Sequence, residues 1–343
     1  SFAKLVYISS WIKCHHPAIF ACALLNAQPM GFYAPAQIVR DAREHGVEVR
    51  AVDVNASLWD NSLEREEGAA PLALRLGFRQ LDGFHEAWAE RLVAARGRPF
   101  TDIEDVARRC ALPARALHIL ADADAFRSIG LDRREALWAV RRLPDDRPLP
   151  LFAAAEAREL GAEAEARLPA MPLSEHVVAD YQTARLSLKA HPMQFLRDRL
   201  RTEGIATCAE ISAGRNHQRA RTAGVVLVRQ RPGKGTAIFI TLEDETGITN
   251  VVLWARRMER FRRAIMGARL LVVDGVIQRS PEGVVHLMAE DIADRTADLQ
   301  LLSEDSMRAT LARADEVARP QYPRTGGRHP RDVRILPKSR DFH

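Results

Sequence analysis

Residues 222–254 have the sequence TAGVVLVRQRPGKGTAIFITLEDETGITNVVLW, in which three apolar stretches are separated by turn-forming residues. Proline and glycine within 232–235, and the glycine at 247, interrupt the apolar stretches as turns do. A basic amphipathic segment, 256–266, follows, and two more apolar stretches come after it. Five short strands with one helix between the third and the fourth is the element order of an OB-fold barrel. We therefore predict an OB fold whose strands are 222–229, 236–243, 248–254, 270–277 and 284–289.

The second predicted strand shows which side chains face outward. Ile238, Ile240 and Leu242 alternate with Phe239 and Thr241, so the aliphatic set is expected inside the barrel and the other two outside. An outward aromatic on this strand is where a base of a single-stranded nucleic acid stacks, for about 1–3 kcal/mol per base. The alternative is that Phe239 packs beneath a neighbouring helix.

Three basic residues flank the first predicted turn of this fold: Arg229, Arg231 and Lys234. Cations at this edge attract the phosphates of a bound strand. The alternative is that they are simply solvated. An OB fold also binds proteins and sugars, so the fold alone leaves the ligand open.

The N-terminal half is mostly helical by periodicity, and one turn in it has a binding signature. Residues 81–85, LDGFH, precede a predicted helix at 86–96 that carries Arg91. Such a helix-hairpin-helix unit presents backbone N–H groups to a phosphate, and the residues concerned are Gly83, His85 and Arg91. Residues 120–126 are a second candidate hairpin, but they lack glycine and carry two carboxylates. The alternative for both hairpins is ordinary helix packing around a turn.

Metal binding is not expected in this chain. Asp122 and Asp124 form a D-x-D pair, but a two-metal site needs a further carboxylate on a rigid sheet. Cys14, His15 and Cys22 do not form the two spaced ligand pairs of a structural zinc site. We therefore predict no metal and no cofactor within these residues.

Length and composition indicate a globular, multidomain protein, and the predicted elements make it α+β: a mostly helical N-terminal half followed by a five-stranded OB barrel. Hydrophobic residues make up 47% of the 343 residues, which argues against a disordered chain, and no apolar stretch approaches the roughly 20 residues of a membrane span. Four scattered cysteines favour a reducing compartment, and we expect a cytoplasmic protein. The chain begins at Ser1 without a methionine, inside an amphipathic pattern, which suggests a cut from a longer protein.

The last 25 residues are basic and rich in proline, with seven Lys or Arg against two Asp. This composition predicts an extended tail that contacts DNA or partners. Its candidate binding residues are Arg331, Arg334, Lys338 and Arg340.

Several motifs together resemble the error-prone branch of the bacterial C-family DNA polymerases, which are related to the replicative alpha subunit. They are WIKCHHP at 11–17, QPMGFY at 28–33, LDRREALW at 131–138, LSLKAHP at 186–192 and SRDFH at 339–343. They cover nearly the whole chain and correspond to the C-terminal part of that family. The resemblance implies these parts: the end of the polymerase fingers in 1–65, a tandem helix-hairpin-helix in 66–142, a helical connector in 143–214, an OB domain in 215–296 and a basic extended tail in 297–343.

The resemblance also implies a function in translesion synthesis and damage-induced (SOS) mutagenesis, as a part of DNA replication and repair. It implies binding of duplex DNA and of single-stranded template, with a Y-family-like polymerase as partner. In the fingers part, Lys13, His15 and His16 would contact a nucleotide phosphate or DNA. Cations at the end of a helix are the simpler explanation of these three residues.

The family's palm domain, with its catalytic aspartates in a Pro-Asp-x-Asp-type strand and its Mg²⁺, has no counterpart in this sequence. We therefore expect the isolated chain to have no polymerase activity. Residues 148–152, PLPLF, stand where the replicative family has a glutamine-containing clamp-binding peptide, so binding to the sliding clamp is expected to be weak or indirect.

Two other functions stay open at this point. A stand-alone helix-hairpin-helix and OB module could bind single-stranded DNA without enzymatic activity. The OB strands alone would also fit an anticodon-binding appendage of an aminoacyl-tRNA synthetase.

Overall fold

The computed structural model describes residues 2–302 except 31–32, 66–71, 144–169 and 233–234. The described residues form two compact units. Unit 1 consists of residues 1–26 and 39–184, and unit 2 consists of residues 27–38 and 185–302. In this part of the chain, no helix has both the length and the apolar character needed to span a membrane.

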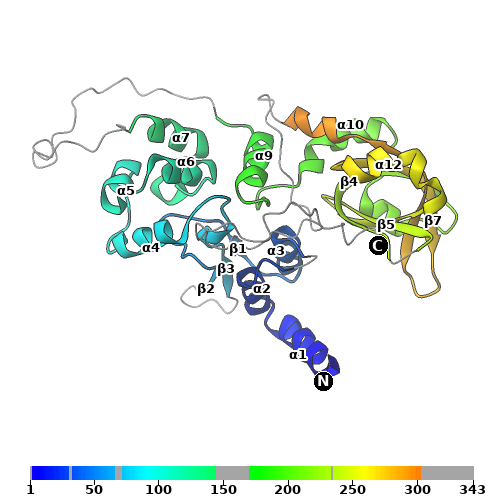
Figure 1. The fold of residues 1–343 in the computed structure, drawn as a ribbon, viewed down its shortest axis with the longest axis horizontal. Coiled ribbons are helices and arrows are strands. Elements are labelled where there is room, and N and C mark those ends of the chain that lie inside the picture. Colours follow the sequence, from blue (N-terminus) through cyan, green and yellow to red (C-terminus); the bar gives the residue numbers. More distant parts are fainter. Residues whose placement is uncertain (1, 31–32, 66–71, 144–169, 233–234, 303–343) are drawn as a thin grey trace, which may run out of the picture. The chain divides into compact units, whose positions relative to one another are not determined.

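Unit 2 contains a closed five-stranded barrel with the strand order β4-β5-β6-β8-β7, drawn in Figure 1. A helix, α12 (Met258–Gly267), connects the third strand to the fourth. The predicted OB-fold barrel and the α+β fold class are therefore confirmed, and the predicted strands agree with the observed ones to within a few residues at most ends. The strands are Arg219–Gln230 (β4), Ala237–Asp244 (β5), Gly247–Trp254 (β6), Leu270–Arg279 (β7) and Val285–Asp294 (β8).

Alternation along β5 separates core from surface as the sequence predicted. Ile238, Ile240 and Leu242 are fully buried inside the barrel, whereas Phe239 is 39% exposed. The helix α12 adds Phe261 to this core and places arginines on its outer side. A strand with a period of two thus fills the barrel with one face and has the other on the outside of the barrel.

Short helices that precede the barrel are held to it by hydrogen bonds to a carboxylate. These are a 3-10 turn, Pro192–Leu196, and the helices α10 (Arg197–Thr202) and α11 (Cys208–Ala213). The Arg197 guanidinium donates to the Asp244 carboxylate at 2.8 Å, and the Cys208 N–H donates to the same carboxylate at 2.8 Å. One carboxylate at the end of β5 therefore holds both helices.

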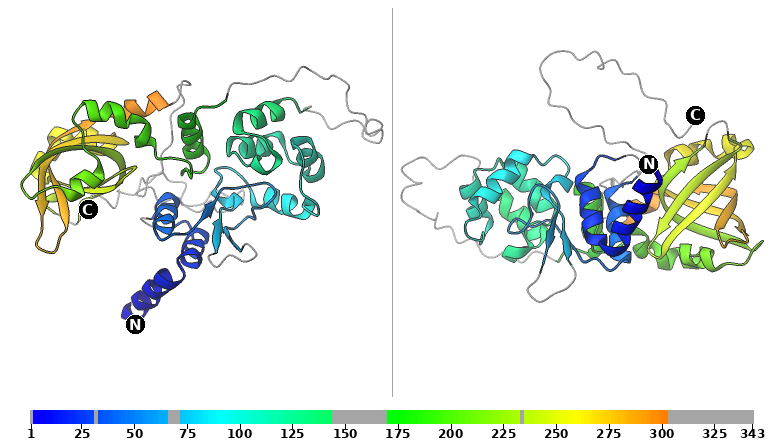
Figure 2. Two further views of the ribbon diagram at one scale, coloured as in Figure 1. Left: turned by 180° about the vertical axis from the view of Figure 1, so that it is seen from behind. Right: turned by 90° about the horizontal axis from the view of Figure 1, so that it is seen from below.

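Unit 1 begins with the helices α1 (Phe2–His15), α2 (Pro17–Asn26) and part of α3 (Pro35–Glu44). Figure 2 shows α1 reaching beyond α2, and none of its residues is buried. A three-stranded sheet follows, with the order β1 (Val49–Arg50), β3 (Ala73–Arg75), β2 (Ser62–Glu64). The sequence predicted no strand in the β2 region. The predicted boundary between residues 65 and 66 falls between β2 and β3, which pair antiparallel in this one sheet.

The other described helices of unit 1 include one at the position predicted for 86–96. They are α4 (Glu86–Ala95), α5 (Ile103–Cys110), α6 (Ala114–Asp122), α7 (Arg133–Arg141) and α9 (Leu173–Thr183). Asp102 caps the start of α5, and Asp132 with Glu135 forms a capping box at the start of α7. In the predicted connector, α9 belongs to unit 1, whereas α10 and α11 belong to unit 2. Residues 184–191, predicted as helix, form no helix.

Candidate nucleic-acid interface

The first hairpin of unit 1 has the geometry that its sequence predicted. Gly83 has φ +77°, a backbone conformation that residues other than glycine rarely adopt. The Asp82 N–H donates to the Thr183 carbonyl at 2.8 Å, so the end of α9 supports the turn. His85 is the N-cap of α4 but makes no side-chain capping bond. The His85 side chain therefore does not cap the first N–H groups of α4, although the Trp88 N–H donates to the His85 carbonyl at 3.0 Å.

Two cations near this hairpin differ from the expectation. Arg91 is exposed, but its guanidinium donates to the Ala111 carbonyl at 3.3 Å, at the end of α5. The sequence missed Arg115, at the start of α6, whose Nη2 lies 3.4 Å from the position that a Cβ on Gly83 would occupy. The sequence did contain a signal for Arg115, because it lies at the start of a helix in the second hairpin unit. Tandem units pack side by side, so this position could have been expected near the first hairpin.

The second hairpin is held together by its own charges. Asp124 has φ +59°, is buried, and pairs with Arg127 at 2.8 Å. Burial raises the pKa of the Asp122 carboxyl above its usual value. Among the described residues, no three His, Cys, Asp or Glu side chains come close enough together to hold a metal ion.

The candidate residues of the fingers part lie at the end of α1. Lys13 Nζ pairs with Asp41 at 2.7 Å, which ties α1 to α3. The ring of Trp11 lies 4.6 Å from that of His15 and 5.6 Å from that of His16. The structure therefore gives Lys13 an internal partner and leaves both histidines exposed.

Cys22 and Cys14, which the sequence did not assign to a zinc site, lie in different surroundings. The buried thiol of Cys22 donates to the Asn61 carbonyl at 3.3 Å, and burial raises its pKa. Cys14 is exposed at the end of α1.

The outer face of the barrel carries the aromatic side chain predicted from β5, and a second one. Phe239 pairs with Val252 across to β6, and Trp254 lies two residues further along the same face of β6. Trp254 is 44% exposed. Thr241 Oγ1 donates to Asn250 Oδ1 at 3.2 Å, also on this face. Sequence reasoning missed Trp254, although the register opposite β5 would have placed it outward.

The prediction for Arg229 is wrong. Its side chain is only 5% exposed, and its guanidinium donates to the Ala268 carbonyl. The cause is a β-bulge between Val226 and Val228, which places Arg229 opposite the inward-facing Ile240. This arginine stabilises the barrel wall rather than a ligand.

The other predicted cations of this edge differ in what the structure says of them. Arg231 is half-buried, and its Nε donates to the Gly235 carbonyl at 3.1 Å, so it braces its own turn. Lys234 lies outside the described residues. So do the tail residues Arg331, Arg334, Lys338 and Arg340, and the segment 148–152.

Two family models match the two units. The model described as a helix-hairpin-helix motif matches residues 46–136. The model described as an OB-fold nucleic acid binding domain matches residues 220–295. An asparaginyl-tRNA synthetase structure from Pyrococcus horikoshii aligns with 26% of this chain and 22% of its own, at 24% identity and a TM-score of 0.23.

Curated proteins match the chain over its entire length. An error-prone DNA polymerase of Rhodopseudomonas palustris (strain HaA2) is 57% identical over 100% of this chain and 32% of its own length. The protein of the same name from Brucella abortus biovar 1 (strain 9-941) is 57% identical over 100% of this chain and 31% of its own. The chain thus spans about a third of the length of these relatives. The resemblance seen in the sequence is confirmed: along its whole length, the chain is a relative of the C-terminal part of the error-prone DNA polymerases.

Proposed function

We propose that this chain is the DNA-binding portion of an error-prone DNA-directed DNA polymerase, a nucleotidyltransferase in its full-length form. The observation that carries the proposal is the 57% identity, over the whole chain, to curated proteins of that name. The matches to a helix-hairpin-helix motif and to an OB-fold nucleic acid binding domain support it.

The two units supply two different kinds of DNA contact. In unit 1, the N–H groups at the start of α4, which receive no side-chain cap from His85, suit the phosphates of duplex DNA together with Arg115. In unit 2, Phe239 and Trp254 offer ring faces to the bases of a single-stranded template. Phosphate contacts and stacking both ignore base identity, which suits a polymerase that must accept any template sequence.

Positively charged side chains that follow Trp254 in the sequence also favour binding of a single strand on the outer side of the barrel. Arg256 and Arg260 come two and six residues after Trp254 and are exposed, with Arg260 paired to Asp291 at 3.1 Å. Positive charge beside exposed aromatic rings is the combination that binds single strands without sequence preference.

The finer assignments follow from the family rather than from these contacts. The proposed cellular roles are translesion synthesis and damage-induced mutagenesis. The proposed location is the cytoplasm, and the proposed partner is a Y-family-like polymerase. The word "error-prone" in the names of the relatives supports the first of these roles. Binding to the sliding clamp is proposed to be weak or indirect, because residues 148–152 contain no glutamine.

Nucleotidyl transfer itself is assigned to the palm of the full-length protein, with its Mg²⁺. The described residues offer no cluster of metal ligands, so we derive no catalytic step from them. We propose that the isolated chain is inactive, and nucleotide incorporation by the pure chain would contradict this.

The first test is binding of a fluorescent single-stranded oligonucleotide across a range of salt concentrations. We expect Phe239→Ala to raise Kd by about 5- to 100-fold, because loss of one stacked base costs about 1–3 kcal/mol. The matched control is Trp138→Ala, which removes an aromatic side chain that is also exposed but lies on α7 of unit 1. Binding that is indifferent to Phe239 would move the DNA contact away from the barrel.

A further inference from the structure

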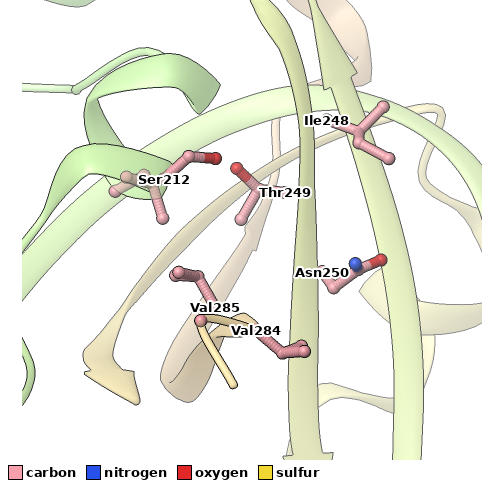
Figure 3. Close-up of a pocket in the computed structure, with 8 residues that line it drawn as sticks. Ser212, Ile248, Thr249, Asn250, Val284 and Val285 are labelled. Carbon is pink, nitrogen blue, oxygen red and sulfur yellow. The ribbon is translucent and has the colours of Figure 1, made fainter. Parts of the chain in front are cut away.

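A small pocket opens at one end of the barrel in unit 2, on the side of β6 away from β5. Its volume is about 290 Å³. That is at the lower end of small-molecule sites, which span about 300–1,000 Å³, so it suits one flat ring rather than a larger ligand. Figure 3 shows six of its lining residues: Ser212, Ile248, Thr249, Asn250, Val284 and Val285.

The pocket exists because two parallel strands separate at this point. The pairing of β6 with β8 begins at Asn250 and His286. Before it, Ile248 and Thr249 on β6 have no partner on β8, and the helix α11 forms the remaining wall. Arg279 holds that wall in place, because its guanidinium donates to the carbonyls of Ser212 at 2.5 Å and Gly214 at 3.1 Å.

The lining combines apolar sides with polar groups. Ile248 and Val284 are exposed apolar side chains at the opening. Figure 3 shows the hydroxyls of Ser212 and Thr249 turned toward each other across the pocket. Thr249 Oγ1 is itself buried and lies beside the Cys208 thiol, so the hydroxyl that a ligand can reach is that of the exposed Ser212.

The pocket is continuous with the stacking face. Asn250 lines the pocket and also accepts the hydrogen bond from Thr241, which lies two residues after Phe239 on β5. That bond uses Asn250 Oδ1 and leaves the Nδ2 group to donate elsewhere. A strand lying across Phe239 would therefore pass the opening of the pocket.

We propose that this pocket takes one unstacked nucleobase from the single strand bound on the outer face of the barrel. The inference rests on the proposed single-strand binding by unit 2. The apolar walls enclose the ring, and the Ser212 hydroxyl and the Asn250 amide bond its polar edge. Single-stranded bases are recognised in this way, splayed out of the stack and hydrogen-bonded at their edges. An apolar side chain from a protein partner would fit the walls but would leave these polar groups without partners.

The test fills the pocket from its exposed side. Ser212→Leu places an isobutyl group in the opening, whereas Ala213→Leu adds the same group at the next residue of α11, which is exposed and does not line the pocket. Each variant of the whole chain, and the wild type, is titrated with two short fluorescent strands of equal length. One strand carries all its bases, and in the other abasic residues replace them.

We expect Ser212→Leu to weaken binding of the base-containing strand by about 5- to 20-fold, the loss of one bound base. Binding of the abasic strand should not change, and Ala213→Leu should match the wild type with both strands. Equal weakening with both strands would overturn the inference, because the substitution would then act on the backbone path. No effect with either strand would also overturn it, and would favour a protein side chain as the occupant.

The same titrations separate this inference from the proposed function. If Phe239→Ala weakens binding of the base-containing strand while Ser212→Leu does not, the stacking face is supported and the base-binding pocket is contradicted. If the wild-type chain binds neither strand, both are contradicted.

Discussion

Two adjacent arginines of α7 show how strongly the role of a residue depends on its surroundings. Arg133 is 1% exposed; its guanidinium donates to the His176 carbonyl at 2.7 Å and to the Asp180 carboxylate. Arg134 is far more exposed and pairs with Glu175 at 3.1 Å. Both pairs join α7 to α9, but only the first is shielded from water. A buried pair contributes far more than an exposed one when one partner is removed.

We expect Arg133→Ala to lower the free energy of unfolding of unit 1 by about 3–5 kcal/mol, because Asp180 would remain as an uncompensated buried charge. Arg134→Ala should cost less than about 1 kcal/mol, as exposed ion pairs do. Urea denaturation followed by circular dichroism measures both. Equal losses for the two variants would show that Arg133 does not carry the contact between α7 and α9.

The sequence could predict half of this arrangement. Arg133 lies on the same helical stripe as Ala136 and Val140, so the 3.6-residue period already places it on the buried side. What the period cannot show is the partner, because Asp180 is 47 residues away and on another helix. Helix α7 itself was predictable, since the capping pattern at its start is local.

At the scale of elements, the strands of the barrel were predictable from the sequence. Which side chains of β4 face inward was not. Alternation in β5 is regular, so the positions of Ile240 and Phe239 follow from the sequence. In β4 the residues around the bulge at Leu227 are all apolar, so alternation there has no polar side to follow. The bulge therefore left no trace in the sequence, and Arg229 turned inward against expectation. Strand β2 was missed because it is only three residues long and lies in a charged segment.

The first hairpin depends on the backbone of a single residue. Gly83 has φ +77°, and a side chain in this conformation costs roughly 1–2 kcal/mol. We expect Gly83→Ala to lower the free energy of unfolding by about that amount. Gly97→Ala is the matched control, because Gly97 has no positive φ and no atom within 4 Å of an added Cβ. That substitution should be neutral or stabilise by up to about 1 kcal/mol.

Chemical denaturation compares the two glycine variants directly. A gel-shift titration with blunt duplex DNA then reports the consequence for binding. If the hairpin supplies phosphate contacts, Gly83→Ala weakens duplex binding and Gly97→Ala does not. A stable Gly83→Ala protein with unchanged folding energy would mean that the turn is less constrained than its geometry indicates.

At the scale of the whole molecule, net charge contributes little to DNA binding. The chain carries only +5 over 343 residues, so attraction to DNA must come from local groups of cations and amides. Each single-strand phosphate that such a group neutralises lowers the slope of log K against log salt by about 0.7, and each duplex phosphate by about 0.9. The two units should therefore show distinct salt dependences with single-stranded and duplex DNA.

Two separate units, each with its own DNA contact, also predict independent effects of substitutions. Arg115→Gln, beside the hairpin of unit 1, should weaken binding to blunt duplex and leave binding to a single strand unchanged. Phe239→Ala, on the barrel of unit 2, should do the reverse. On a primer–template with a single-stranded overhang, both substitutions should act. Their effects on the binding free energy should add to within about 0.5 kcal/mol, as expected of residues that share no partner.

The double variant decides between two arrangements of the bound DNA. Additive losses on the primer–template mean that the hairpin holds the duplex while the barrel holds the overhang of the same molecule. A double variant no weaker than the poorer single variant would mean that only one of the two units engages this DNA. In that case linking the two units would give no gain in affinity, because avidity requires both contacts at once.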